Sequence, residues 1–166
     1  MKHLYFKTIL LCFCLLASVN VFAEAVEIDG IYYNLVTETK QAEVTENPNK
    51  YSGTVTIPES VTYNGVTYSV TSIGDYAFRL CSGLTSVTIG KGVKTIEYGA
   101  FSNCTELTDV YCYADSVPST HRTTFPTSYI KNATLHVPAE SIEQYNATAP
   151  WSNFGTIVAY LRTKMP

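Results

Sequence analysis

The feature that most constrains the fold is a segment that occurs twice in the chain. Residues 73–89 read IGDYAFRLCSGLTSVTI, and residues 96–112 read IEYGAFSNCTELTDVYC, so the offset from Ile73 to Ile96 is the period of the repeat. Seven of the aligned positions are identical, and nearly all of these are apolar. A repeat of this length cannot bury its own apolar face, so it must stack on its neighbours to form a continuous core. The repeat therefore predicts a coil of stacked units rather than a reactive site.

Each copy divides into segments of different periodicity. At the end of each copy, apolar residues alternate with polar ones, which predicts a short strand with one face inward. These ends are Leu84–Ile89 and Leu107–Cys112. The middles, Asp75–Cys81 and Tyr98–Cys104, centre on an Ala-Phe pair and predict a one-turn helix with phenylalanine as a core plug. A second short extended segment is expected in each coil, at Val70–Ile73 and at Val93–Ile96.

The pattern continues beyond the two clear copies. Residues 55–57 and 135–137 repeat the apolar alternation of the strands, and Phe125 follows Phe101 at nearly the same offset as Phe101 follows Phe78. The sequence therefore predicts four strands in one ladder. It also predicts that these three phenylalanines are plugs stacked one above another.

Short signals predict hairpins at the N-terminal end and a plug at the C-terminal end. Asp29-Gly30 and Asn64-Gly65 each lie between β-rich arms, which is typical of tight hairpins, and residues 42–45 are expected to pair back on the first hairpin. Residues 139–145 predict a short helix, and residues 156–160 a closing strand. The C-terminal plug is expected to comprise Trp151, Phe154 and Ile157.

The repeated pattern I-G-x-x-A-F-x-x-C-x-x-L-x-x-V-x-I resembles the BspA-like leucine-rich repeats of bacterial surface proteins. The resemblance is specific over Ser52–Cys112 and looser at the DGIYYNL start and the ATLHVP…W-x-x-F end, which look like the caps of such proteins. It implies an α/β fold, a short right-handed leucine-rich-repeat solenoid with a parallel strand ladder, one-turn helices, a β-hairpin N-cap and a mixed C-cap. Only two repeats match the pattern well, fewer than in longer members.

Residues 1–23 have the pattern of a secretory signal peptide. Lys2 and Lys7 precede an apolar run at Ile9–Leu16, which is too short to span a membrane, and Val21-Phe22-Ala23 is a small-x-small cleavage site. The signal predicts export to the cell surface, the medium or the periplasm. The mature chain, 24–166, is expected to form one domain, with an N-terminal cap at 24–51, repeat coils at 52–138 and a C-terminal cap at 139–166.

The charge balance of the mature chain excludes some partners. Cleavage removes Lys2 and Lys7, so that 11 basic residues become 9 against 14 acidic ones, and the formal charge goes from −3 to −5. An acidic chain that lacks a basic cluster is not suited to nucleic acid or to an anionic lipid surface. We therefore expect no nucleic-acid partner and a position peripheral to the membrane at most.

The cysteines and histidines do not form a pattern typical of metal or catalytic sites. Cys81 and Cys104 have the same phase in successive coils, so their backbones are expected about 5 Å apart, which permits a disulfide. The favoured alternative is that they point inward as small buried residues, because each belongs to the core pattern, and Cys112 likewise replaces a core isoleucine. Neither His121 nor His136 belongs to a paired motif. We expect no cofactor, no metal and no catalytic residue.

The outward positions of the ladder are the candidate binding face. Alternation places threonine, tyrosine and histidine side chains outside, and the chain contains 13 tyrosines, whose broad apolar rings and polar tips suit recognition. Threonine and tyrosine are also simply good strand formers, which is the plainer explanation for any one of them. The candidate residues are Thr56, Thr88, Asp109, Tyr111, Tyr113 and His136.

Three functions are compatible with these observations. The first is a non-catalytic recognition module, and the family resemblance implies adhesion to a host or neighbouring-cell protein or glycan. The second is a structural surface protein that works in an array without a specific ligand. The third is an enzyme acting on surface glycans, which no motif supports. Residues 115–117, Asp-Ser-Val, also resemble a short O-glycosylation site at Ser116. The sequence predicts no oligomeric state.

Overall fold

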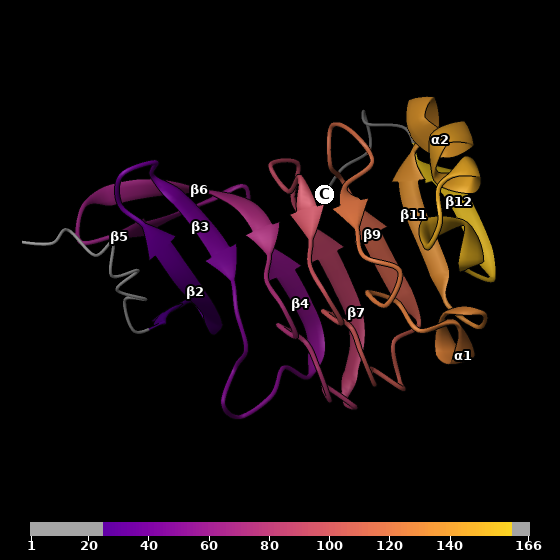
Figure 1. Ribbon diagram of the computed structural model, residues 1–166, viewed down its shortest axis with the longest axis horizontal. Coiled ribbons are helices and arrows are strands. Elements are labelled where there is room, and N and C mark those ends of the chain that lie inside the picture. Colours follow the sequence, from indigo (N-terminus) through magenta and orange to yellow (C-terminus); the bar gives the residue numbers. More distant parts are fainter. Residues whose placement is uncertain (1–24, 161–166) are drawn as a thin grey trace, which may run out of the picture.

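The strand ladder predicted from the repeat is present and is one strand longer than expected. The computed structural model describes residues 25–160, so the predicted signal peptide lies outside the described residues. Five parallel strands form one sheet, and their spatial order follows the sequence (Figure 1). The fifth strand covers the residues predicted as the closing strand, and it pairs in parallel with the fourth. The strands are β4 (Gly53–Ile57), β7 (Leu84–Ile89), β9 (Asp109–Cys112), β11 (Thr134–Pro138) and β12 (Thr156–Tyr160).

A second sheet of seven strands contains the other extended segment of each coil. Its repeat strands run parallel to one another, and its first three strands pair antiparallel among themselves. The third of these strands joins the repeat strands through a parallel pairing. The extended segment predicted at residues 70–73 is confirmed as the end of the strand Val66–Ile73. The one predicted at residues 93–96 contains the shorter strand Thr95–Ile96. The strands are β1 (Val26–Ile28), β2 (Ile31–Val36), β3 (Gln41–Val44), β5 (Ser60–Tyr63), β6 (Val66–Ile73), β8 (Thr95–Ile96) and β10 (Ser119–Thr120).

Both predicted hairpin turns are confirmed by the backbone. Asp29 and Gly30 have φ values of 52° and 81°, and Asn64 and Gly65 have 49° and 78°. Two successive positive φ values define the turn that matches the right-handed twist of a two-residue hairpin. The first turn joins β1 to β2 and the second joins β5 to β6. The second hairpin therefore lies between the first two strands of the ladder in the sequence, and those two strands still pair in parallel, with one register shift at Gly53/Thr54.

The core is a column of stacked aromatic rings, as the period predicts. Phe78 and Phe101 lie 4.9 Å apart between ring centroids at an interplanar angle of 7°, and Phe101 and Phe125 lie 4.9 Å apart at 9°. Tyr51 continues the column at one end, 4.6 Å from Phe78, and Trp151 continues it at the other, 5.1 Å from Phe125. All five rings are buried. Successive coils therefore share one continuous apolar interior.

The helical turns predicted at residues 75–81 and 98–104 are wrong. Both segments form consecutive tight turns, because Tyr76 and Leu80 adopt φ values of 58° and 63°. Gly99 and Asn103, one period later, have 60° and 63°. Left-handed residues at this spacing interrupt a right-handed helix.

Helices of the described residues lie in the C-terminal part of the chain. The helix predicted from residue 139 is confirmed as a 3-10 turn that continues into a short α-helix. Trp151 and Phe154, predicted as part of the C-terminal plug, are buried, and Ile157 is half-buried against the core. The helical segments are α1 (Thr127–Ile130), η1 (Ala139–Ser141), α2 (Ile142–Ala147) and η2 (Trp151–Asn153).

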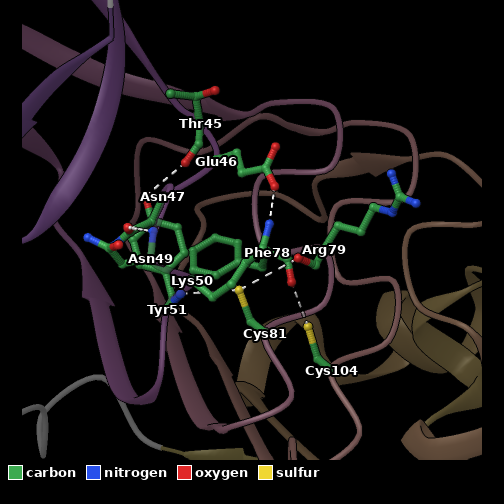
Figure 2. A network of polar contacts seen from close by, with 10 residues as sticks. All are labelled: Thr45, Glu46, Asn47, Asn49, Lys50, Tyr51, Phe78, Arg79, Cys81 and Cys104. Carbon is green, nitrogen blue, oxygen red and sulfur yellow. Dashed lines mark hydrogen bonds and ion pairs between the residues drawn. The ribbon is translucent and has the colours of Figure 1, made fainter.

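The three described cysteines are free and buried, in agreement with the favoured prediction. The Cys104 thiol donates a hydrogen bond to the Phe78 carbonyl of the preceding coil at 3.0 Å, and the Tyr51 backbone N–H donates to Cys81 Sγ at 3.3 Å (Figure 2). The Tyr145 hydroxyl donates to Cys112 Sγ at 3.2 Å. The thiols therefore satisfy polar groups inside the core.

We expect these thiols to resist alkylation in the folded protein. Burial raises the pKa of Cys104 to about 12 and that of Cys112 to about 11, and the reactive thiolate is therefore scarce at pH 8. The measurement is iodoacetamide labelling of the mature protein, followed by mass spectrometry. All three cysteines should remain unmodified in buffer and react in denaturant without reductant. A mass two hydrogens lower, with two cysteines reacting only after reduction, would contradict the free-thiol structure.

Candidate binding face

The strand register assembles most of the predicted binding residues into two adjacent rows. Thr56, Thr88, Tyr111 and His136 are direct partners across β4, β7, β9 and β11. Asp109 lies two residues before Tyr111, in the neighbouring row. Thr56 is exposed, and the other four are half-buried between their neighbours on the sheet. We call this outward side of the five-stranded sheet the ladder face.

Three of the predicted residues form one cluster on the ladder face. His136 Nε2 lies 2.9 Å from Asp109 Oδ1, within hydrogen-bond distance. The imidazole also stacks on the Tyr111 ring, with centroids 4.1 Å apart at 12°. The Thr108 hydroxyl donates to the other carboxylate oxygen of Asp109 at 2.9 Å. These contacts fix the orientation of both rings.

The cluster predicts an acidic shift of the Asp109 pKa. The hydrogen bond from His136, followed by that from Thr108, holds the pKa of the Asp109 carboxyl below its usual value. A depressed folded-state pKa stabilises the protein above the ordinary aspartate pKa of about 3.9, and this contribution is lost as the pH falls through the folded value. Because the Asp109 side chain is 37% exposed, solvent screens the effect on unfolding, and NMR titration is the appropriate measurement. We expect His136→Ala to return the Asp109 pKa toward the ordinary value, and an identical titration in both proteins would contradict the contact.

The sixth predicted residue, Tyr113, lies at the end of β9. Its ring packs edge-on against Tyr160 of β12, with centroids 5.0 Å apart at 75°. The Tyr160 hydroxyl donates to the Cys112 carbonyl at 3.4 Å. Tyr113 therefore extends the aromatic part of the ladder face toward the C-terminal strand. Its contact with Tyr160 depends on the position of β12 as the fifth strand of the ladder.

The structure also contains an aromatic row that sequence analysis missed. Tyr76 and Tyr98 lie edge to face with centroids 5.3 Å apart, and Tyr98 lies 4.9 Å from the His121 ring. All three are exposed, and they project from the turns between the two sheets. Tyr98 and His121 are separated by one full period of the repeat. Their equivalent positions in successive coils could therefore have indicated that the two rings lie side by side.

Two properties of the described residues concern metal binding and membrane crossing. Residues 25–160 bring no three histidine, cysteine or acidic side chains together as metal ligands. None of their helices combines the length and hydrophobicity that a membrane span requires. His121 and His136, which the sequence treated as isolated, contact Thr123 and Asp109 respectively.

Comparisons with known proteins agree with this arrangement of strands. A family profile described as "BspA type Leucine rich repeat region (6 copies)" matches residues 51–149. The chain is similar to a solved leucine-rich repeat protein of Bacteroides capillosus at 22% identity, with a TM-score of 0.54, over 70% of this chain and 100% of that one. At 22% identity this likeness concerns the fold alone. No curated protein matches the sequence.

Two longer solved proteins are also similar. A leucine-rich cell surface protein of Faecalibacterium prausnitzii shares 26% identity, with a TM-score of 0.48, over 72% of this chain and 28% of that one. A leucine-rich repeat protein of Bacteroides ovatus shares 22% identity, with a TM-score of 0.47, over 80% of this chain and 40% of that one. The chain therefore spans well under half the length of these two proteins.

Proposed function

The chain belongs to the BspA-type leucine-rich repeat family, and from this premise we propose that it is an exported, non-catalytic recognition module of the cell surface. Leucine-rich repeat proteins are generally recognition modules rather than enzymes. The proposed ligand is a protein or glycan of a host or neighbouring cell, bound through the ladder face. The observation that carries the proposal is the strand register that unites Thr56, Thr88, Tyr111 and His136 in one row beside Asp109.

The side chains of the ladder face have the properties of a recognition surface. The stacked rings of Tyr111 and His136 offer rigid apolar area at low entropic cost, and Asp109 supplies a fixed carboxylate beside them. Threonine hydroxyls on β4 and β7 continue the row with small hydrogen-bonding groups. Because only five strands contribute, the face is small, and we expect modest affinity from one copy.

The proposal extends to export and to the ends of the coil. Residues 1–23 act as a signal peptide, and the mature chain begins at Glu24. The coil is right-handed, residues 24–51 form its N-terminal cap, and residues 139–166 form its C-terminal cap; of these, residues 24 and 161–166 lie outside the described residues. Cover at both ends is needed because an open coil would expose its apolar core to water.

A binding screen of the mature protein against host matrix proteins and glycans tests the function. For a ligand that binds, we expect Tyr111→Ala, Tyr113→Ala and His136→Ala each to weaken binding while the melting temperature changes little. The matched control is Tyr63→Ala, an exposed tyrosine on the hairpin of the other sheet. If the three ladder variants bind as the wild type does, the ligand does not use this face. If Tyr63→Ala weakens binding equally, the effect is not specific to the ladder face.

A scaffold role is the second candidate, and the ends of the ladder favour it. β4 and β12 are the two outermost strands of the five-stranded sheet, so each presents one edge that no strand of that sheet covers. Such edges can pair between copies of a chain. Light scattering at increasing protein concentration tests this role, which requires the mean mass to rise with concentration; a constant monomer mass would exclude it.

A further inference from the structure

The missed aromatic row borders a shallow groove on a surface other than the ladder face. The groove has a volume of about 670 Å³ and runs over the turns of successive coils. Its lining combines the rings of Tyr76 and Tyr98 with the guanidinium groups of Arg79 and Arg122. Small polar side chains complete it, namely Ser102, Asn103 and Thr123. We call this surface the turn groove.

The side chains that line the turn groove carry a net positive charge, although the whole protein is acidic. Two of the three arginines in the chain line it, and no aspartate or glutamate does. Residues 25–160 form no ion pair with either guanidinium. Asp75, beside the groove, accepts a hydrogen bond from the Tyr98 backbone N–H at 2.9 Å. The two arginines can therefore pair with an incoming anion.

The rings of the turn groove are held in place by the next coil. A Cβ atom added to Gly99 would lie 2.7 Å from Cε1 of Tyr76, so the tyrosine ring packs directly on the glycine backbone. Tyr76 itself has a φ of 58°, a conformation that disfavours side chains and that glycine adopts one period later. The Arg79 guanidinium lies 5.1 Å above the Tyr76 ring, a cation–π contact. A large aromatic residue thus occupies a position whose backbone favours glycine.

We propose that the turn groove binds an acidic oligosaccharide, a sugar chain that carries carboxylate or sulfate groups. A pyranose ring has an apolar C–H face that packs on tyrosine, and its rim of hydroxyls matches the Ser102, Asn103 and Thr123 side chains. Guanidinium groups bind carboxylate and sulfate oxygens through paired, charge-assisted hydrogen bonds. This site is distinct from the ladder face.

Two other polyanions fit the turn groove less well. An extended peptide is usually held by a strand edge, and an acidic motif by a cluster of arginines. The groove residues lie in turns and loops rather than on an edge strand, and the two arginines stand apart among neutral polar side chains. Single-stranded nucleic acid also stacks on aromatic rings, but it requires a positively charged track along several phosphates, which two arginines do not supply. The two separate charges, together with the hydroxyl and amide side chains of the lining, favour the sugar.

Calorimetry of the purified protein with defined oligosaccharides tests the proposal. The probes are an oligogalacturonate for the carboxylate, a sulfated oligosaccharide of similar length for the sulfate, and a neutral oligosaccharide as reference. We expect at least one acidic probe to bind about tenfold or more tightly than the neutral one, and the probe that binds identifies the anion. Arg122→Gln and Tyr98→Ala should each weaken that binding about tenfold, because each removes one exposed contact group.

Ladder-face variants separate this site from the proposed function. Tyr111→Ala should bind the acidic probe as the wild type does, and all the variants should keep the wild-type melting temperature. The proposal is overturned if neither acidic probe binds, if the neutral probe binds equally well, or if Tyr111→Ala rather than Arg122→Gln abolishes binding. It is also overturned if an acidic peptide or a single-stranded oligonucleotide binds more tightly than both sugars.

Discussion

Replacing Phe101 by alanine is expected to lower the free energy of unfolding by about 3–5 kcal/mol, the usual cost of truncating a buried phenylalanine. Phe101 is fully buried and stacks at 4.9 Å on both Phe78 and Phe125, so the truncation opens a cavity in the middle of the column. A domain is typically stable by about 5–15 kcal/mol, and the variant should therefore unfold at much lower urea concentration. Urea denaturation followed by circular dichroism measures the loss.

Tyr111→Ala is the control for Phe101→Ala. Tyr111 is half-buried on the ladder face, where its ring contacts His136. We expect its replacement to cost about 1 kcal/mol or less, a typical surface effect. If Phe101→Ala and Tyr111→Ala unfold at the same urea concentration, the assignment of inward and outward positions is wrong.

Replacing Trp151 by alanine is the second large effect that we expect, again about 3–5 kcal/mol. Trp151 is fully buried, its ring lies 5.1 Å from Phe125 and 5.3 Å from Tyr145, and its Nε1 donates a hydrogen bond to the Pro118 carbonyl at 3.1 Å. Truncation therefore creates a cavity and also leaves a buried carbonyl without its donor. Thermal unfolding measured by calorimetry gives the size of the loss.

The form of the unfolding transition adds a second test at Trp151. If the C-terminal residues belong to the same core as the coils, wild type and Trp151→Ala should each unfold in a single transition. Trp151→Phe keeps an aromatic ring but loses the hydrogen bond to Pro118, so its stability should fall between the two. A separate early transition in Trp151→Ala, with the main one unshifted, would show that the C-terminal segment is an independent unit.

The inward positions could be predicted from the sequence because an apolar residue recurs at each of them in successive copies of the repeat. Phe78, Phe101 and Phe125 recur at near-constant spacing, and an apolar residue with that period has to face a shared core. The hairpins were predictable for a local reason, since Asn64-Gly65 permits positive φ at both turn positions. β12 was predicted as a strand, but its parallel pairing with β11 was not, because the sequence of its residues lacks the repeat.

The turns were harder to predict because their conformation contradicts the preferences of their residues. Tyr76 and Leu80 rarely adopt positive φ, and the Ala-Phe segment around them has good helix formers. Contacts with the next coil decide the outcome: the Tyr76 backbone N–H donates to the Tyr98 carbonyl, and that of Leu80 to the Ser102 carbonyl. The aromatic row of the turn groove follows from these turns and was therefore missed with them.

The candidate binding face was predicted as a set of outward positions but not as a set of contacts. Alternation alone placed Asp109, Tyr111 and His136 outside. It could not indicate that the imidazole bridges the carboxylate and the phenol ring, since that depends on the relative register of β9 and β11. The spacing between these two strands is longer than the period of the two clear copies, so the register had to come from the structure.

Successive coils stack their phenylalanine rings into one column, and this stacking determines which positions of each coil face inward and which face outward. NMR of the mature protein with selectively labelled phenylalanine tests it most directly. We expect nuclear Overhauser contacts between the rings of Phe78 and Phe101 and between those of Phe101 and Phe125, but none between Phe78 and Phe125. Three rings that show no contact with one another, each surrounded by unrelated segments, would contradict the stacked coil and the binding surfaces derived from it.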